Sequence, residues 1–332
     1  MTQVPFEILR NDGKSGQSHF QSFVVDVEEN QAILTALLKI RSEQDPSLAM
    51  RYSCRQAICG SCAMRVNGKS RLVCTTMVGP EFRAHGKIRI EPMLNQMVVR
   101  DLVVDQTPFW DRYNAVQPFL IHDPSHPMPE GKETRMSPEQ VEQFYETPRC
   151  IACAACYSAC PAVGSDPEFL GPMALAKLYR FTVDPRDTAY HQRLQSVQNQ
   201  KLWLCLRCNL CVEACPKDVR PAERIVDLKR LAVQEIGTPE HGSRHAQKFL
   251  TNIEDGGVLN ETKLARETLG LFGMLGQVGK GISMMRHGKS LKKHPPIQGV
   301  SEVKAIYADL NQPEDLKGRQ RPAGKGVKGG EQ

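Results

Sequence analysis

The stretch "CLRCNLCVEACP", residues 205–216, decides the fold, because its four cysteines stand at gaps of two, two and three and a proline closes the run. An earlier stretch, "CIACAACYSACP" at 150–161, repeats this spacing. The pattern is typical of bacterial ferredoxins with two clusters, in which the fourth cysteine of each run ligates the cluster of the other run. The spacing therefore predicts one [4Fe–4S] site at Cys150, Cys153, Cys156 and Cys215, and a further site at Cys160, Cys205, Cys208 and Cys211.

The remaining four cysteines, Cys54, Cys59, Cys62 and Cys74, lie in "CRQAICGSC" and "RLVC". The order C-x4-C-x2-C with a fourth cysteine further on is the plant-type [2Fe–2S] pattern. The last gap is eleven residues, which is shorter than in plant ferredoxins. Zinc is the alternative ligand, but structural zinc sites favour pairs of C-x2-C. A [2Fe–2S] cluster is therefore predicted here.

Composition narrows the class of protein. The chain has 332 residues and 12 cysteines, and its N-terminus lacks the pattern of a secretory signal. We therefore expect a reducing compartment, where clustered cysteines bind metal more often than they form disulfides. The formal charge of +6 is mild and predicts no nucleic-acid partner. The chain contains no run of eighteen apolar residues, so we predict no membrane span.

The first part of the chain is predicted to be a small α+β unit of the β-grasp type, the [2Fe–2S] ferredoxin domain of residues 1–106. A helix is expected over 31–44, with Asn30 as its N-cap and with Ile33, Leu37 and Ile40 on one face. The hairpin at 62–76 should turn at Asn67-Gly68. Further strands are expected at 6–10, 20–27 and 86–93.

Residues 107–136 are rich in Pro, His and Gly and are expected to be a connector. Ser137 as N-cap, Pro138 and Gln140 then predict the start of a helix. Residues 137–238 follow helical periods, for example at 171–181 and 222–237, and predict an all-α domain that carries both cysteine runs.

Residues 239–332 are expected to be a C-terminal extension. The segment 266–294 mixes apolar residues with glycines and ends basic, so it is either a packed helix or an amphipathic helix that contacts a membrane or a partner. The glycines weaken any helix there. Residues 318–332 are expected to be disordered.

Three clusters in one chain indicate a relay of single electrons. The chain has no G-x-G-x-x-G loop after a strand, no Walker loop and no nucleophile–base set, so no catalytic residue is predicted. The electron donor and acceptor are therefore expected on partner subunits.

The chain resembles the iron–sulfur subunit of succinate dehydrogenase and fumarate reductase over residues 5–235. The resemblance rests on "YSCRQAICGSCAMRVNG" (52–68), "MVVRDLVVD" (97–105), "FLGPMALAKLYRFTVDPRD" (169–187) and "CVEACPKDV" (211–219). It implies a partner flavoprotein that carries FAD and oxidises succinate to fumarate. It also implies electron flow through the three clusters to quinone, with the chain peripheral on the cytoplasmic side of an energy-transducing membrane.

Three departures from that family are visible. Most members have no cysteine at the position of Cys208 and hold a [3Fe–4S] cluster, so a third cluster of the [4Fe–4S] type is expected here. The Trp pair after the first run is missing, and Leu206 replaces a His, so the usual quinone-contacting residues are absent. The C-terminal tail resembles the small subunit of heterodisulfide reductases, which implies a cysteine-rich acceptor subunit in place of a haem-binding membrane anchor.

Alternatives remain open at this point. A fumarate reductase, linked to quinol or to thiols, would have the same clusters. An iron–sulfur subunit of another flavoprotein oxidase would have the twin runs, but the [2Fe–2S] set disfavours it. A zinc-binding scaffold is the alternative outside redox chemistry.

Overall fold

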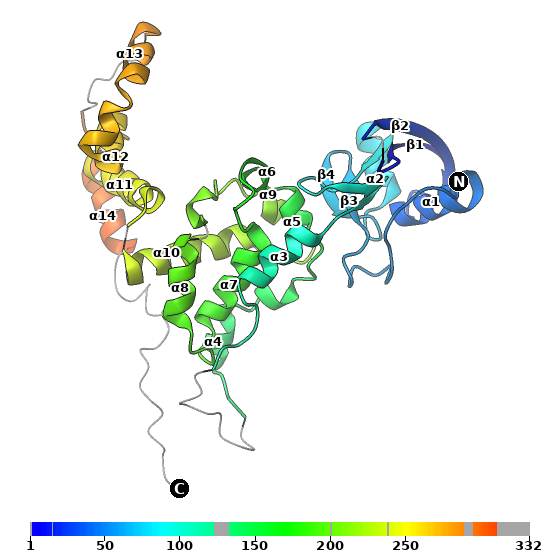
Figure 1. Ribbon diagram of the computed structural model, residues 1–332, viewed down its shortest axis with the longest axis horizontal. Coiled ribbons are helices and arrows are strands. Elements are labelled where there is room, and N and C mark those ends of the chain that lie inside the picture. Colours follow the sequence, from blue (N-terminus) through cyan, green and yellow to red (C-terminus); the bar gives the residue numbers. More distant parts are fainter. Residues whose placement is uncertain are drawn as a thin grey trace. The chain divides into compact units, whose positions relative to one another are not determined.

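The computed structural model describes residues 2–14, 16–122, 133–199, 201–237, 239–288 and 295–310 (Figure 1). It divides the chain into two units. The first consists of Met1–Met136 and Gln140–Lys229 and contains all twelve cysteines; the second consists of Ser137–Glu139 and Arg230–Gln332.

A five-stranded sheet in the order β2-β1-β5-β3-β4 forms the N-terminal part of the first unit. β1 and β5 are parallel and the other pairs are antiparallel, which is the expected β-grasp arrangement. One face is apolar because alternate residues of β1, such as Phe6 and Ile8, are fully buried. The strands are β1 (Thr2–Asn11), β2 (Ser18–Val27), β3 (Ala63–Val66), β4 (Lys69–Leu72) and β5 (Ile88–Glu91); helix α2 (Val78–His85) precedes β5.

The predicted helix over 31–44 begins later than expected and is not capped by Asn30. α1 (Ile33–Lys39) has Ala32 as its N-cap and continues as a π-helix over Ile40–Gln44. Ala32 forms an isolated β-bridge with Met77, which holds the backbone extended up to the first helical residue. The predicted apolar face is confirmed, since Ile33, Leu37 and Ile40 are all fully buried.

The predicted turn at Asn67-Gly68 is confirmed, and both residues have positive φ. A second hairpin, β6 (Val98–Arg100) and β7 (Val103–Val104), carries Asp101 at its turn. The buried Asp101 carboxylate accepts from Nε of Arg10 at 3.0 Å and from the backbone of Ala49 at 2.9 Å. Asp101 therefore stabilises the interior of the sheet domain.

The expected connector opens with a helix that sequence reasoning missed, α3 (Thr107–Ala115). The Asp105 carboxylate accepts from the backbone and hydroxyl of Thr107, at 2.9 and 2.7 Å, and Phe109 is buried. Phe109 packs edge-on against Tyr157 with 5.6 Å between ring centroids. Helix α3 is thus anchored to the first unit through Phe109, while most of its other residues are exposed; residues 123–132 lie outside the described residues.

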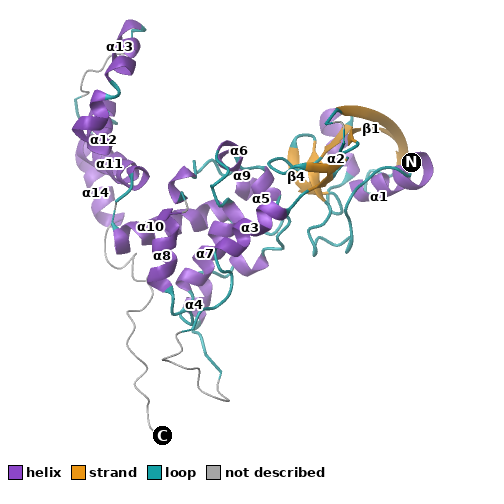
Figure 2. Cartoon of the chain, in the orientation of Figure 1, coloured by secondary structure: helices purple, strands orange, loops and turns teal. Residues whose placement is uncertain are grey.

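The rest of the first unit is helical, so the predicted α+β class is confirmed (Figure 2). The central helix α7 (Pro172–Val183) packs against α3 and is buried along most of its length. α7 also contacts α5 (Ala155–Ser158), α8 (Tyr190–Asn199) and the 3-10 turn Thr147–Arg149. The other helices are α6 (Pro161–Ser165), α9 (Leu210–Glu213) and two that are divided between the units, α4 (Pro138–Glu142) and α10 (Pro221–Ile236); a further 3-10 turn spans Leu202–Leu204.

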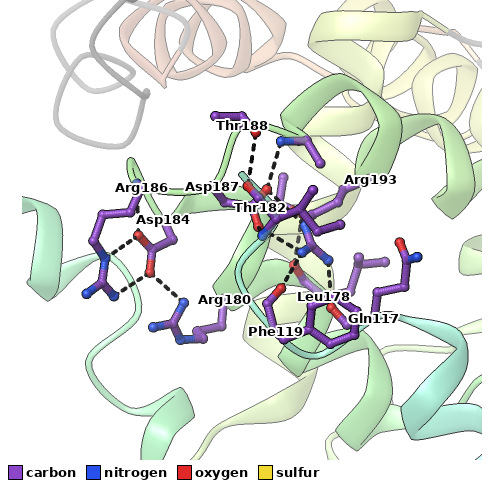
Figure 3. A network of polar contacts seen from close by, with 12 residues as sticks. Gln117, Phe119, Leu178, Arg180, Thr182, Asp184, Arg186, Asp187, Thr188 and Arg193 are labelled. Carbon is purple, nitrogen blue, oxygen red and sulfur yellow. Dashed lines mark hydrogen bonds and ion pairs between the residues drawn. The ribbon is translucent and has the colours of Figure 1, made fainter. Parts of the chain in front are cut away.

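A buried polar network joins α7, α8 and the segment that follows α3 (Figure 3). Arg193 forms an ion pair with the fully buried Asp187 at 2.8 Å and donates to the carbonyls of Val116, Gln117 and Phe119. Burial disfavours the charge on Asp184, but its contacts with Arg186 and Arg180 outweigh this effect and lower its pKa. The network fixes the turn between the two helices.

The second unit is a set of helices. α11 (His241–Gly256) packs against α12 (Glu261–Leu275) and α14 (Val300–Leu310), and α13 (Val278–Arg286) follows α12 (Figure 1). Gly270, at φ +70°, kinks α12. None of the described helices is long and apolar enough to cross a membrane. The predicted disorder of 318–332 concerns residues outside those described.

Candidate metal centres

The first cysteine set lies on the loop between α1 and β3 and on the turn after β4. Backbone N–H groups point at its sulfurs: that of Ala57 donates to Sγ of Cys74, and that of Cys59 donates to Sγ of Cys54, both at 3.3 Å. Cys62 and Cys74 are buried, whereas Cys59 is exposed. The loop has positive φ at Arg55, Ala57 and Gly60, which turns successive amides inward.

The thiols of this set differ in their pKa values. A hydrogen bond from the hydroxyl of Ser61, at 3.1 Å, is the main cause that lowers the pKa of Cys59 to about 6. Burial raises the pKa of Cys62 to about 12, and its neighbour Cys74 adds to the rise. A site of this kind needs a positively charged metal to hold its buried thiolates.

The second set surrounds one small cavity. Three cysteines of the first run line it together with the last cysteine of the second run: Cys150, Cys153, Cys156 and Cys215. The third set lines a similar cavity in the reverse combination: Cys160, Cys205, Cys208 and Cys211. The structure therefore brings the eight cysteines together in the crossed arrangement predicted from their spacing.

The thiols border these cavities rather than converge on one point. Among the described residues, no group of three Cys, His, Asp or Glu side chains is placed to hold a single metal ion. Cys208 is the exposed member of the third set, and Leu206 beside it is 68% exposed. The third site thus lies at the surface of the first unit.

The two runs have the same backbone geometry. The residues on either side of the second cysteine have positive φ in both runs: Ala152 and Ala154 in the first, Arg207 and Asn209 in the second. A short helix follows in each case, and these helices, α5 and α9, pack together. The repeated spacing therefore encodes a repeated loop.

Burial is the main influence on the thiol pKa values in the second and third sets. It raises the pKa of Cys153 to about 11 and that of Cys211 to about 12, and it raises the pKa of Cys156 well above its ordinary value. Four thiolates in each small apolar cavity would repel one another strongly. The donor set fits an iron–sulfur cluster, whose iron atoms compensate this charge.

A lysine lies near the first cysteine of each run: the half-buried Lys177 near Cys150, and the buried Lys229 near Cys205. Lys177 donates to the carbonyl of Thr147 at 3.4 Å, and Lys229 donates to the carbonyl of Cys205 at 3.1 Å. Burial lowers the pKa of both lysines, to about 8 for Lys229, while Cys150 and Cys205 act in the opposite direction. Both lysines thus place a cation near thiolate sulfur.

The first and second sites are in direct contact. A methyl group built on Gly60 would lie 2.8 Å from Cβ of Cys153, which is closer than real side chains approach. Asn95 fixes the neighbouring backbone, since its Nδ2 donates to the carbonyls of Tyr157 and Cys160 at 2.9 and 3.0 Å. The first site therefore borders the second.

Sequence reasoning missed Lys177, Lys229, Asn95 and the contact of Gly60. A lysine within the otherwise apolar stretch of α7 was a signal for Lys177. The role of Asn95 depends on tertiary contacts that no local pattern indicates.

Two family models match the chain. A 2Fe-2S iron-sulfur cluster binding domain matches residues 5–111, and a 4Fe-4S dicluster domain matches residues 146–219. The first match ends within α3, at residue 111.

Curated relatives match most of the chain. The fumarate reductase iron-sulfur subunit of Haemophilus influenzae is 37% identical over 66% of this chain and 89% of its own length. The mitochondrial succinate dehydrogenase [ubiquinone] iron-sulfur subunit 1 of rice, Oryza sativa subsp. japonica, is 38% identical over 67% of this chain and 79% of its own length. Among solved structures, a chain of the Mycobacterium smegmatis Sdh1 complex superposes with a TM-score of 0.65 at 25% identity, over 71% of this chain and 98% of that one.

One relative also matches the C-terminal extension. The 8-methylmenaquinol:fumarate reductase iron-sulfur subunit of Wolinella succinogenes is 32% identical over 86% of this chain and 90% of its own length. Because this match covers 86% of the chain, it must extend beyond residue 241 into α11 and α12 of the second unit.

Proposed function

The chain belongs to the family of iron–sulfur subunits of succinate dehydrogenase and fumarate reductase, and we propose that it relays electrons from a flavoprotein subunit through three clusters to quinone. Succinate oxidation takes place on the flavoprotein, which carries the FAD. The chain is the electron-transfer subunit of an oxidoreductase complex.

The crossed arrangement of the two cysteine runs carries this proposal. Each of two neighbouring cavities is lined by four thiols, and the first site contacts the second through Gly60 and Cys153. Single electrons pass between clusters only when the clusters lie close together, as these sites would place them. A zinc scaffold has no need of three contiguous sites.

We assign a [2Fe–2S] cluster to Cys54, Cys59, Cys62 and Cys74, and a [4Fe–4S] cluster to Cys150, Cys153, Cys156 and Cys215. The clusters, when bound, supply one-electron oxidation and reduction. The chain's own residues position the thiolates and modulate their charge. Ser61 and the backbone amides donate to the sulfurs of the first site, and Lys177 places a cation beside the second.

We assign a second [4Fe–4S] cluster to the third site, with Cys208 as its fourth ligand. Cys208 lines the same cavity as Cys160, Cys205 and Cys211, which supports the assignment. A [3Fe–4S] cluster would leave a thiol of the ferredoxin pattern unused.

We propose that the electron acceptor is a membrane-associated subunit, with the chain peripheral on the cytoplasmic side of the membrane. The exposed Leu206 and Leu210 lie beside the exposed Cys208 and offer this acceptor an apolar contact. The missing His and Trp residues favour a cysteine-rich acceptor subunit over a haem-binding anchor. Purification of the native complex with an ordinary pair of haem-binding anchors would overturn this part.

A second candidate function is fumarate reduction with electrons from a quinol. The Wolinella succinogenes relative, which matches across the C-terminal helices, favours it. Rates of succinate oxidation and of fumarate reduction, measured on the purified complex with ubiquinone and menaquinone analogues, distinguish the two directions.

Spectroscopy tests the cluster assignment directly. We expect metal analysis of the native complex to find iron and acid-labile sulfide for one two-iron and two four-iron clusters. EPR should detect all three after reduction with dithionite, and the oxidised complex should lack the signal of a three-iron cluster. Zinc in the metal analysis, together with a silent EPR spectrum, would rule out the electron relay.

A further inference from the structure

An apolar stripe runs along the end of α12 and the length of α13. It consists of Leu275, Val278, Ile282 and Met285, which follow at steps of three, four and three and therefore lie on one side of a helical path. These four side chains are between 43% and 69% exposed, and Phe272, one further step back, is 91% exposed. Apolar side chains that gather in this way mark a binding surface.

The stripe has no partner within the second unit as far as the structure describes it. α13 contains no buried residue among its nine. α11, α12 and α14 pack together, whereas Figure 1 shows α13 continuing beyond them. A lone amphipathic helix of this length is marginal in water, so it needs a surface on which to fold stably.

The charge around the stripe is of one sign. Residues 268–301 contain no Asp or Glu but five Lys and Arg, namely Lys280, Arg286, Lys289, Lys292 and Lys293. The whole chain has nearly balanced charges, 43 basic against 37 acidic residues. Lys289, Lys292 and Lys293 lie outside the described residues; within the described residues 272–288, Lys280 and Arg286 are the formally charged side chains and both are positive.

We propose that this segment, residues 272–286 with its cations Lys280 and Arg286, binds the surface of an anionic lipid bilayer. An exposed apolar stripe with basic flanks and no acidic residue matches the interface of a negatively charged leaflet, where the apolar side chains enter the headgroup region and the cations remain at the phosphates. A protein partner with an apolar groove would explain the stripe but would give no reason for the complete lack of acidic residues.

The proposal extends the proposed function, because electrons that leave at a membrane need a chain held there. It does not depend on the clusters. A binding measurement can therefore succeed even if the electron relay is wrong.

Flotation with lipid vesicles tests the proposal on the full-length chain, alone and in its native complex. We expect co-flotation with vesicles of phosphatidylcholine that contain about a third phosphatidylglycerol. Binding should fall at least about tenfold with pure phosphatidylcholine, or when salt is raised to about 0.5 M, because salt screens the attraction of surface charges.

Two variants locate the contact. Ile282→Asp combined with Met285→Asp places charge on the stripe and should lower the vesicle-bound fraction at least about tenfold. Ile306→Asp, an exposed apolar residue of α14 that lies outside the stripe, is the matched control and should bind like the wild type. Unchanged cluster EPR and circular dichroism in all variants confirm that the fold is intact.

Two outcomes would overturn the proposal. One is equal binding of the double variant and the wild type to anionic vesicles, or no binding by either. The other is normal vesicle binding by the double variant together with loss of a subunit from its purified complex, which would assign the stripe to a protein interface. Loss of cluster signals in the wild type with intact vesicle binding would instead contradict the electron relay alone.

Discussion

Under the proposed ligand assignment, Cys208 is the single residue that determines the iron content of the third site. It is exposed, yet it lines the same cavity as the three other thiols of its set. A thiolate in this place adds one negative ligand to the cluster. A cluster with this ligand should therefore accept an electron less readily than one without it.

We expect Cys208→Ala to convert the third cluster to the three-iron form and to raise its midpoint potential. The reason is the loss of one negative ligand and one iron corner. EPR of the oxidised complex should then show a three-iron signal that the wild type lacks. Leu206→Ala, on the same exposed loop, is the control and should leave the spectrum unchanged. An oxidised spectrum that is identical in wild type and Cys208→Ala would contradict the ligand assignment.

Lys177 provides a test of how the chain adjusts the second site. Its ammonium group is partly buried and acts electrostatically on Cys150. A unit charge at a distance of about 10 Å and an effective dielectric constant of about 20 contributes about 1.7 kcal/mol, and each 1.4 kcal/mol corresponds to about 59 mV for one electron. Lys177→Met should therefore lower the midpoint potential of the second cluster by tens of millivolts.

The measurement is a redox titration followed by EPR. Lys177→Arg retains the positive charge and should titrate close to the wild type, which separates charge from packing. Equal potentials for the Met variant and the wild type would show that the lysine has no electrostatic role.

At the scale of elements, the junction of α7 and α8 depends on the side chain of Arg193, which holds one buried carboxylate and three backbone carbonyls. Arg193→Met should lower the free energy of unfolding by about 3–5 kcal/mol, because it leaves the buried Asp187 carboxylate without its cation. Three backbone carbonyls that follow α3 would also lose their donor.

Thermal unfolding of the complex, monitored by circular dichroism, measures this loss. Arg186→Met is the matched control, since Asp184 keeps Arg180 as a second partner. We expect a clearly smaller loss for it. Similar midpoints for both variants would contradict the importance of the Asp187 pair.

The elements that could be predicted from sequence are those specified by local patterns. The alternation of apolar and polar residues indicates β1 and β2, and the pair Asn67-Gly68 indicates the hairpin turn. The grouping of eight cysteines around two cavities could be predicted, because their spacing along the chain restricts which thiols can come together. α3 was missed because the proline-rich segment after it suggested a connector, although Thr107 and Pro108 after Asp105 are a helix-start signal.

The start of α1 and the place of Asp101 could not be predicted, because both depend on residues distant in sequence. Ala32 is held by Met77, and Asp101 is paired with Arg10. Both contacts join residues that come together only when the sheet domain has folded, so no local pattern indicates them. The same holds for the contact between Gly60 and Cys153.

For the molecule as a whole, the contact at Gly60 sets how closely the sheet domain approaches the helical part. Gly60→Ala should push the two loops apart, because its new methyl group would overlap Cβ of Cys153. We expect weaker magnetic interaction between the first and second clusters in the fully reduced complex, and slower electron transfer between them.

Gly68→Ala is a close control for this change. Gly68 also has a positive φ, of +82°, but no atom lies within 4 Å of a methyl group placed on it. Both variants therefore carry similar backbone strain, of about 1–2 kcal/mol, and only Gly60→Ala adds the overlap. Equal effects of the two variants on the EPR spectrum would mean that the contact does not control the distance between the clusters.

The crossed cysteine sets also restrict the order of events during biosynthesis. The second cavity lacks its fourth thiol until the ribosome has added Cys215 to the growing chain, and the third cavity lacks its fourth thiol until Cys211 has been added. Iron insertion at both sites must therefore follow translation of nearly two thirds of the chain. Once filled, the second site would join Cys156 to Cys215, 59 residues apart, and the third would join Cys160 to Cys205, 45 residues apart. Each site would therefore cross-link the two runs of the helical part by itself.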